Sequence, residues 1–233
     1  MQKYKTIGII GGQGPVSTAD FYLRIVKYYQ VNFGARYVRD FPPMIIFSVP
    51  TPDLVESVED EETTFSLIAE ATKKLERDGS DFIIIACNSL QYFIERLQTT
   101  VKIPIIGIAP LIAEYIKDKG YKTVGLLATN TTIKKKIYEF YLGEKGIQLI
   151  TPGEIDQNSV TEVILNEIGG ISGVKEMKKL KKVVDSVRKA GAEAILLACT
   201  ELPLVIKQQD VSITLIDCNE LYIQKAAKFS SNT

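Results

Sequence analysis

The sequence contains no histidine and no tryptophan, and it has only three cysteines among 233 residues. The absence of histidine excludes Ser-His-Asp triads, Cys-His proteases and HExxH metalloproteases, because each uses an imidazole as base or as metal ligand. Three scattered cysteines without a CxxC pair are also a poor set of metal ligands. We therefore expect no bound metal, and any general base must be a carboxylate, a lysine, a tyrosine or a thiolate.

Neither sign of charge is in excess, since 28 Lys and Arg balance 28 Asp and Glu. No basic stripe is interleaved with aromatic residues, so nucleic acid is not an expected partner. No apolar run approaches the ~18 residues that a membrane helix needs, and no membrane association is expected. The first residues lead into a strand pattern and not into a signal peptide. An odd number of cysteines without a secretion signal indicates a reducing compartment, so we expect a cytoplasmic protein.

Two segments of the chain nearly repeat each other. Residues 79–90 read GSDFIIIACNSL and residues 191–202 read GAEAILLACTEL, at a constant offset of 112. Each segment has a glycine, a short apolar run and then a cysteine, which is Cys87 in the first and Cys199 in the second. This pattern predicts a buried strand with a thiol at its carboxyl end. A second pair, KTIGII at 5–10 and KTVGLL at 122–127, indicates a duplicated unit of about 115 residues.

Apolar runs alternate with helical patterns, which predicts an α/β fold with parallel sheets. We expect strands at 5–10, 43–48, 82–86, 103–107, 122–127, 147–150, 194–198 and 213–216. We expect helices at 16–32, 61–77, 89–98, 109–119, 131–143, 157–168, 173–190 and 219–229. The expected domains are 1–100 plus 210–233, carrying Cys87, and 101–209, carrying Cys199. The last strand and helix, 212–229, are expected to cross back and complete the first domain.

A glycine-rich loop, Gly11-Gly12-Gln13-Gly14-Pro15, follows the first expected strand. Open backbone N–H groups in such a loop, together with the helix start behind it, suit an anion such as a carboxylate. The spacing is not GxGxxG and the proline breaks that pattern, so a dinucleotide site is only weakly indicated. A plain tight turn is the structural alternative.

Four motifs together resemble the aspartate/glutamate racemase family, whose members racemise amino acids without pyridoxal phosphate. They are IGIIGGQGPVSTADFYLRI at 7–25, ACNS at 86–89, LLATNTT at 126–132 and ACTELP at 198–203. In this order they cover essentially the whole chain. The resemblance implies two pseudo-symmetric parallel-sheet α/β domains with the active site in the cleft between them. It also implies a small amino-acid substrate, no cofactor and a homodimer.

The resemblance further implies that Cys87 and Cys199 are the acid–base pair. The substrate's α-carboxylate and amine would be held by Asn88, Ser89, Thr129, Thr132 and Thr200, with Gln13 and Thr51 nearby. The chemistry agrees, because racemisation needs a base on one face of Cα and a proton donor on the other, and thiol and thiolate can exchange these roles.

Each of these cysteines also has a structural interpretation. A lone cysteine after an apolar strand is more often a small buried hydrophobe. We keep that interpretation for Cys218, which has no repeat partner, whereas the matched placement of Cys87 and Cys199 argues against it. Glu201 is either a carboxylate that steers Cys199 or an acid at a helix start.

The chain departs from the family pattern at three positions. Gln91 stands where members commonly have histidine. Leu54 and Gly169 replace the arginine and lysine that the resemblance assigns to the side-chain carboxylate of acidic substrates. Losing two charge-assisted hydrogen bonds costs roughly 3–6 kcal/mol, or about 10²–10⁴ in kcat/KM. We therefore expect a substrate other than free aspartate, either neutral or bulkier.

Other functions remain open at this point. One alternative is another enzyme of the wider superfamily, such as a hydantoin racemase, a maleate-type isomerase or a malonate-type decarboxylase. Another is a non-catalytic two-domain protein that binds a ligand. Deuterium incorporation at Cα of amino acids distinguishes an amino-acid racemase from both of these alternatives.

Overall fold

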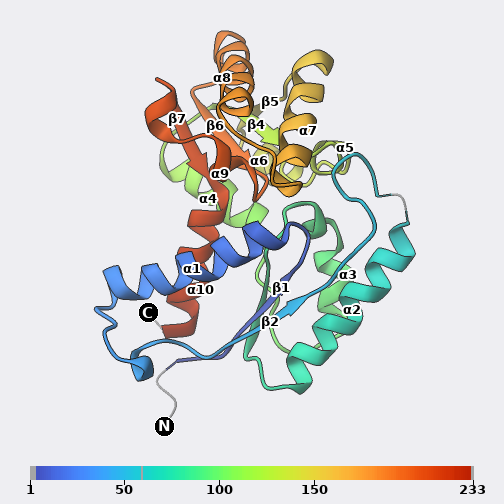
Figure 1. Ribbon diagram of the computed structural model, residues 1–233, viewed down its shortest axis with the longest axis vertical. Coiled ribbons are helices and arrows are strands. Elements are labelled where there is room, and N and C mark those ends of the chain that lie inside the picture. The colour runs from blue at the N-terminus through green and yellow to red at the C-terminus, as the bar shows by residue number, and fades with distance from the viewer. Residues whose placement is uncertain (1–3, 59, 232–233) are drawn as a thin grey trace. The chain divides into compact units, whose positions relative to one another are not determined.

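The computed structural model describes residues 4–58 and 60–231 (Figure 1). Helices and strands alternate along the chain, and the strands form two sheets in which neighbouring strands are parallel. The predicted α/β class with parallel sheets is confirmed. Two compact units divide the chain. Unit 1 comprises Met1–Pro52, Glu59–Gly107 and Asn219–Thr233, and unit 2 comprises Asp53–Val58 and Ile108–Cys218.

Unit 1 is built on a three-stranded sheet in the order β2-β1-β3. Its strands are β1 (Ile7–Gly11), β2 (Met44–Ser48) and β3 (Phe82–Ile85), and its helices are α1 (Pro15–Asn32), α2 (Glu61–Arg77), α3 (Ile94–Gln98) and α10 (Cys218–Ser231), with 3-10 turns η1 (Val38–Asp40) and η2 (Ser89–Phe93). α2 packs on all three strands, and α1 and α10 lie on the other side of the sheet (Figure 1). All of β1 and β3 is buried, which explains their unbroken apolar runs.

Unit 2 is built on a four-stranded sheet in the order β5-β4-β6-β7. Its strands are β4 (Thr123–Ala128), β5 (Gln148–Ile150), β6 (Ala194–Ala198) and β7 (Thr214–Asp217). Its helices are α4 (Ile108–Asp118), α5 (Asn130–Lys134), α6 (Glu139–Glu144), α7 (Glu154–Ile168), α8 (Val174–Lys189) and α9 (Leu202–Val205), with the 3-10 turn η3 (Gln208–Asp210). α7 and α8 pack together and bury side chains such as Val160, Leu180 and Val184 against Leu127 and Ile195.

The strand registers repeat between the units. Ile7 pairs with Phe82 in unit 1, and Val124 pairs with Ala194 in unit 2. These partners are related by the offsets of 117 and 112 that the sequence repeats display. The order β2-β1-β3 therefore recurs as β5-β4-β6, and Cys87 and Cys199 follow equivalent strands.

The strand expected at 103–107 is reduced to a single bridge between Ile83 and Ile105. Pro104 has no N–H and cannot donate to a ladder, although its carbonyl accepts from the Ile83 N–H at 2.9 Å. Further along, the buried hydroxyl of Tyr222 accepts from the Ile85 N–H at 3.2 Å and donates to the Ile106 carbonyl. A side chain of α10 thus takes the place of a missing ladder bond.

The expectation that the last strand returns to the first domain is wrong. β7 pairs with β6, so this strand stays in unit 2 and only α10 crosses back. In unit 2, β7 pairs with the edge of β6 that faces away from β4. The corresponding edge of β3 in unit 1 is already partly occupied by the bridge to Ile105. The helix expected at 131–143 is also interrupted, because Lys136 adopts a left-handed conformation with φ 53° between α5 and α6.

The ionisation of the buried Tyr29 phenol makes core packing in unit 1 testable by the pH dependence of stability. Its ring is buried on α1, its hydroxyl donates to the Ala227 carbonyl at 3.2 Å, and burial raises the pKa of Tyr29 from 10.0 to about 12. Burial therefore favours the neutral phenol. The contribution of the neutral Tyr29 phenol to the free energy of unfolding is complete below pH 10. It is lost as pH rises from 10 through 12, by roughly 2–3 kcal/mol.

We expect Tyr29→Phe to cost about 1 kcal/mol at pH 7, since one hydrogen bond is lost. Above pH 10 the wild type should lose more free energy of unfolding than the variant, because only the wild type has this phenol to ionise. Urea unfolding of both proteins at stepped pH values measures the difference. Equal losses in the two proteins across this range would contradict the assignment.

Candidate active site

In unit 1, the expected site residues lie at the carboxyl ends of adjacent parallel strands. Gln13 follows β1, Thr51 follows β2, and Cys87 and Asn88 follow β3. Because β1 lies between β2 and β3, all these loops leave the same edge of the sheet, where ligands collect in α/β folds. Cys87, Asn88 and the next residue, Ser89, are buried, whereas Gln13 and Thr51 are half-buried.

The glycine loop after β1 lies so close to the backbone at Val49 that position 12 has no room for a side chain. Gly12 and Gly14 have φ values of 103° and 104°, and a Cβ on Gly12 would lie 2.6 Å from the Val49 nitrogen. The hydroxyl of Thr18 accepts from the Gly12 N–H at 3.0 Å and donates to the Gly14 carbonyl at 3.0 Å. The N–H of Gly12 is thus used inside the loop, so the expectation that it stays open to an anion is wrong.

The side-chain amide of Gln13 has a hydrogen-bond partner for its nitrogen but none for its oxygen in the described chain. Its Nε2 donates to the Val49 carbonyl at 2.7 Å. Its Oε1 is buried and has no hydrogen-bond partner within the described chain. A buried acceptor without a donor is costly, so this oxygen suits a ligand N–H group.

Asn88 contacts a residue that the sequence analysis missed. Its Nδ2 donates to Oδ1 of Asn219 at 3.4 Å, and both side chains are buried. Asn219 lies in the first turn of α10, which returns to unit 1 from the far end of the chain. The only sequence signal was its place at the start of the helix expected at 219–229.

In unit 2, Thr129 follows β4 and caps α5. Its hydroxyl accepts from the Thr132 N–H at 3.1 Å and donates to the Thr132 hydroxyl at 3.0 Å. Both residues are buried, and the cap fixes their orientation. The next strand in the sheet, β6, ends directly before Cys199, so these residues share one edge of the second sheet.

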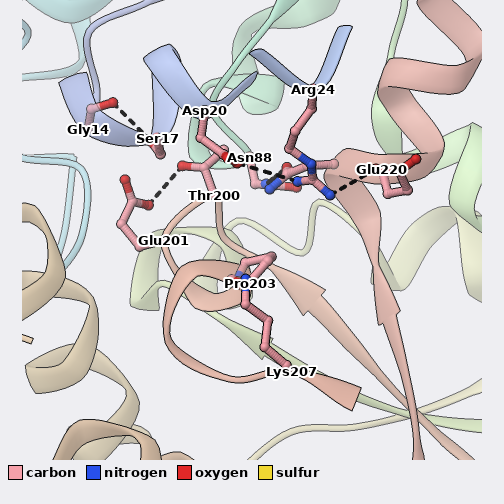
Figure 2. A network of polar contacts seen from close by, with 11 residues as sticks. Gly14, Ser17, Asp20, Arg24, Asn88, Thr200, Glu201, Pro203, Lys207 and Glu220 are labelled. Carbon is pink, nitrogen blue, oxygen red and sulfur yellow. Dashed lines mark hydrogen bonds and ion pairs between the residues drawn. The ribbon is translucent and has the colours of Figure 1, made fainter. Parts of the chain in front are cut away.

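Cys199 lies against a carboxylate. Its Sγ donates to Oε2 of Glu201 at 3.0 Å, and the Thr200 hydroxyl donates to the same oxygen at 2.8 Å. Figure 2 shows the Thr200 and Glu201 side chains pointing toward one another. All three residues are buried, and Glu201 makes no side-chain capping bond to α9. The hydrogen bond to Glu201 fixes the orientation of the Cys199 thiol.

Cys218 differs from the other two cysteines. Its side chain is fully buried, and this burial, together with the charge of Asp217, raises the pKa of the Cys218 thiol. The thiol form is therefore favoured, as in a buried structural cysteine. None of the three cysteines forms a disulfide.

The two positions where cations were expected differ in setting. Leu54 is buried in the Asp53–Val58 segment, and Gly169 is exposed at the end of α7. The α7 residue beside the end of β4 is Gln157, whose Nε2 donates to the Ala128 carbonyl at 3.0 Å. Twelve residues separate Gln157 from Gly169, which is about 18 Å along a helix. Gln157, which the sequence analysis missed, carries a buried Oε1 without a hydrogen-bond partner in the described chain.

Two kinds of feature are absent from the described residues. Across 4–58 and 60–231, no three or more His, Cys, Asp or Glu side chains are grouped so as to hold a metal ion. In the same part of the chain, none of the helices combines the length and the apolar character required for crossing a membrane.

The sequence matches a family model, described as Asp/Glu/Hydantoin racemase, over residues 10–226. The chain belongs to this racemase family. It is 30% identical over 211 residues to the broad specificity amino-acid racemase RacX of Bacillus subtilis, and the match covers 91% of this chain and 92% of RacX. The resemblance stated from the four motifs is confirmed, and so is the enzyme class, an isomerase of the amino-acid racemase type.

Solved racemase structures share the fold. An aspartate racemase homologue from Pyrococcus horikoshii is 31% identical, with a TM-score of 0.82 over 97% of this chain and 99% of that one. The aspartate racemase of Picrophilus torridus is 29% identical, with a TM-score of 0.82 over 96% and 94%. A glutamate racemase from Francisella tularensis in complex with D-glutamate, at 21% identity and a TM-score of 0.69 over 97% and 80%, shows the same fold.

The Cys199–Glu201 contact predicts a charge effect on thiol reactivity. Glu201→Gln keeps the size of the side chain but removes a unit charge about 3 Å from the sulfur, an interaction of several kcal/mol at an effective dielectric constant of 20. Thiolate formation at Cys199 becomes easier, so we expect iodoacetamide to alkylate Cys199 roughly tenfold faster or more. Mass spectrometry of the labelled peptides measures the rate.

Cys87 in the same molecule serves as the internal control, and its labelling rate should stay unchanged. Glu201→Asp keeps the charge and should leave the rate at Cys199 within about threefold of wild type. An unchanged rate at Cys199 in Glu201→Gln would show that the carboxylate does not control this thiol.

Proposed function

We propose that this chain is a cofactor-independent amino-acid racemase in which Cys87 and Cys199 exchange a proton at Cα. The observation that carries the proposal is the equivalent placement of the two cysteines. Each follows a buried parallel strand, and the two strands occupy matching positions and registers in the two sheets. Family membership supports the reaction type.

The reaction needs one thiolate and one thiol. The thiolate removes the α-proton from one face of Cα, and the thiol delivers a proton to the other face. Because the Cys199 thiol donates a hydrogen bond to Glu201, the described arrangement suits Cys199 as proton donor and Cys87 as base. The opposite enantiomer requires the reverse assignment. The proposal requires both thiols to approach one substrate molecule from opposite sides.

The substrate's amino-acid core would be held by the polar residues that follow the strands. The charge that develops on the α-carboxylate needs fixed donors. We assign this role to the amide and hydroxyl groups of Asn88, Ser89, Thr129, Thr132 and Thr200. The uncommitted Oε1 of Gln13 supports a contact with the ammonium group, and Thr51 leaves the same sheet edge.

We propose further that the preferred substrates have neutral side chains. Leu54 is buried and apolar where acidic-substrate members carry an arginine, and Gln157 offers a neutral amide beside the end of β4. The relative RacX is a broad specificity amino-acid racemase, which agrees with a site without a fixed cation for one acidic side chain. We also place the enzyme in the cytoplasm as a homodimer, which agrees with its three buried cysteines outside any disulfide and with the family resemblance.

Both thiols should be required for racemisation. Serine is a far weaker base at neutral pH, so Cys87→Ser and Cys199→Ser should each abolish conversion between enantiomers. Each single variant keeps the base on one face and should still exchange Cα–H of one enantiomer only. Deuterium wash-in from D₂O, read by NMR for each enantiomer separately, measures both effects.

Cys218→Ser is the matched control. It removes the third thiol, and activity per folded molecule should stay at the wild-type level, although a buried hydroxyl lowers stability. Near wild-type racemisation by either Cys87→Ser or Cys199→Ser would overturn the two-thiol mechanism. Exchange on hydantoins but not on amino acids, in the same assay, would replace the proposed function with the hydantoin alternative.

Free aspartate should not be the best substrate. Without the two cations, its side-chain carboxylate lacks roughly 3–6 kcal/mol of charge-assisted hydrogen bonding. We expect at least one neutral L-amino acid to exceed aspartate and glutamate in kcat/KM by about tenfold or more. The measurement is a comparison of kcat/KM across the L-amino acids under one set of conditions.

Two variants separate position from charge. Leu54→Arg places a cation at the buried position and should raise kcat/KM for aspartate, whereas Gly169→Lys adds the same charge at the exposed end of α7. We expect only Leu54→Arg to improve aspartate turnover. If the wild type prefers aspartate by tenfold or more, another cation fills this role and the assignment of Leu54 is wrong.

A further inference from the structure

Asn88 and Thr200 occupy matching places in the two repeats, because each directly follows a cysteine at the offset of 112. The hydroxyl of Thr200 donates to its neighbour in sequence, Glu201, at 2.8 Å (Figure 2). The first repeat has Ser89 at the position of Glu201, so Asn88 has no carboxylate beside it in sequence. The Asn88 side chain also makes no capping bond to the 3-10 turn η2 that follows it. Neither of these local contacts fixes the orientation of Asn88.

Helix α10 supplies a contact to the Asn88 amide from far along the chain. Nδ2 of Asn88 donates to Oδ1 of Asn219 at 3.4 Å, although 131 residues separate the two in sequence. Both residues are 3% exposed, so this hydrogen bond lies away from bulk water. A primary amide has a donor end and an acceptor end of nearly the same shape, and its neighbours decide which way each end points. By accepting from Nδ2, Asn219 favours one of the two orientations.

The part of α10 that carries Asn219 is anchored in unit 1. Three residues further along, on the same face of the helix, the buried hydroxyl of Tyr222 accepts from the Ile85 N–H at 3.2 Å. The Tyr222 ring packs edge-on against Phe21 of α1, with 6.1 Å between the ring centroids. Ile85 lies two residues before Cys87, so α10 contacts the chain before the cysteine as well as after it. A group held on such an element is oriented more precisely than one held on a loop.

We propose that Asn219 is a positioning residue for the racemisation and that it acts by orienting the amide of Asn88. This inference rests on the proposed function, because it needs Asn88 to contact the substrate. Nδ2 carries two N–H bonds, of which one goes to Asn219 and the other to the α-carboxylate. A donor that is already aimed at this group stabilises the charge that develops there without reorganisation during the reaction. Asn219 itself does not touch the substrate.

Asn219→Leu tests the orientation. Leucine has nearly the size of asparagine but accepts no hydrogen bond, so the Asn88 amide loses this partner. Because the misplaced donor acts mainly in the transition state, we expect kcat to fall by roughly 10²-fold and KM to change by less than about threefold. Racemisation rates of the best neutral amino acid over a range of concentrations give both parameters. An unchanged kcat would overturn the inference.

A double-mutant cycle distinguishes positioning from an independent role. Asn88→Ala removes the donor itself and should lower kcat by about 10²–10³-fold. If Asn219 acts through Asn88, adding Asn219→Leu to Asn88→Ala should lower kcat by less than about threefold more. A double variant that shows the full product of the two single losses would contradict the proposed role.

Ser230→Ala is the matched structural control. Ser230 is buried near the other end of α10, and its hydroxyl donates to the Lys5 carbonyl at 2.7 Å. Eleven residues separate it from Asn219, which is about 16 Å along a helix. The variant removes a buried hydrogen bond of the same helix far from the site, so it should lower the free energy of unfolding in urea and leave kcat unchanged. A loss of kcat as large as that of Asn219→Leu would show that the stability of α10, and not an orientation, controls the rate.

Asn219→Asp keeps an acceptor oxygen at the same place, and an acidic residue is favourable in the first turn of a helix. Its charge should raise KM for a substrate that carries a carboxylate, whereas kcat should stay within about tenfold of wild type because the Asn88 amide keeps its partner. A fall in kcat equal to that of Asn219→Leu would oppose the inference. Circular dichroism checks the folding of every variant, and Asn219→Ser, with a side chain too short to reach Asn88, replaces Asn219→Leu if leucine prevents folding.

Wild-type racemisation and its loss in Cys87→Ser are measured in the same assay. An active wild type with independent losses at Asn88 and Asn219 overturns only the role of Asn219. A wild type without racemase activity overturns the proposed function, and the inference with it. The two failures are therefore told apart.

Discussion

The arrangement of the site depends on one constraint, which is that parallel strands end at a common edge of their sheet. In each unit the central strand and its neighbour deliver their following loops to that edge, so residues far apart in sequence become neighbours. β1 and β3 bring Gln13 and Cys87 to one edge, and β4 and β6 do the same for Thr129 and Cys199. Because both strands that carry a cysteine are buried and apolar, each thiol is offered at a fixed position from a rigid element.

Duplication makes the two thiols equivalent in position but not in surroundings. At the offset of 112, Asn88 corresponds to Thr200 and Ser89 corresponds to Glu201. Glu201 accepts a hydrogen bond from Cys199, and a serine cannot supply that charge at the same point of the first repeat. A two-base enzyme needs one protonated and one ionised thiol at the start of each turnover. The carboxylate of Glu201, which the first repeat replaces with a serine, is a simple physical means of setting that difference before the substrate binds.

Local patterns in the sequence were sufficient to predict the strands that precede the two cysteines. The pairing of the remaining strands depended on contacts between residues far apart in the sequence. The glycine, apolar run and cysteine of each repeat predicted both strands, and the registers in the sheets follow the same offsets. The strand expected at 103–107 failed because Pro104 cannot donate, and the gap is spanned by Tyr222, from more than a hundred residues away. β7 belongs to the second sheet because it pairs with the edge of β6. A short stretch of sequence does not show which sheet edge a strand will join.

The site residues divide in the same way. Cysteines and small polar residues directly after a strand were predictable, since the strand fixes where they lie. Asn219 and Gln157 were missed because each is a single polar residue on a helix, and only the packing of that helix brings it to a strand end. The buried oxygen atoms without partners, on Gln13 and Gln157, become visible only when every hydrogen bond nearby is assigned.

Helix α1 connects the loop chemistry to the molecular surface. It begins directly after Gly14, whose carbonyl accepts hydrogen bonds from the hydroxyls of Ser17 (Figure 2) and Thr18, so these bonds join the helix start to the loop that carries Gln13. The helix is anchored on α10 through the hydrogen bond of Tyr29 to the Ala227 carbonyl and through the ion pair of Arg24 with Glu220. These contacts with α10 restrain the helix whose first turn supports the glycine loop. Rigid support of a positioning loop lowers the entropy lost when a substrate is bound, so α10 supports the candidate site both through Asn219 and through its contacts with α1.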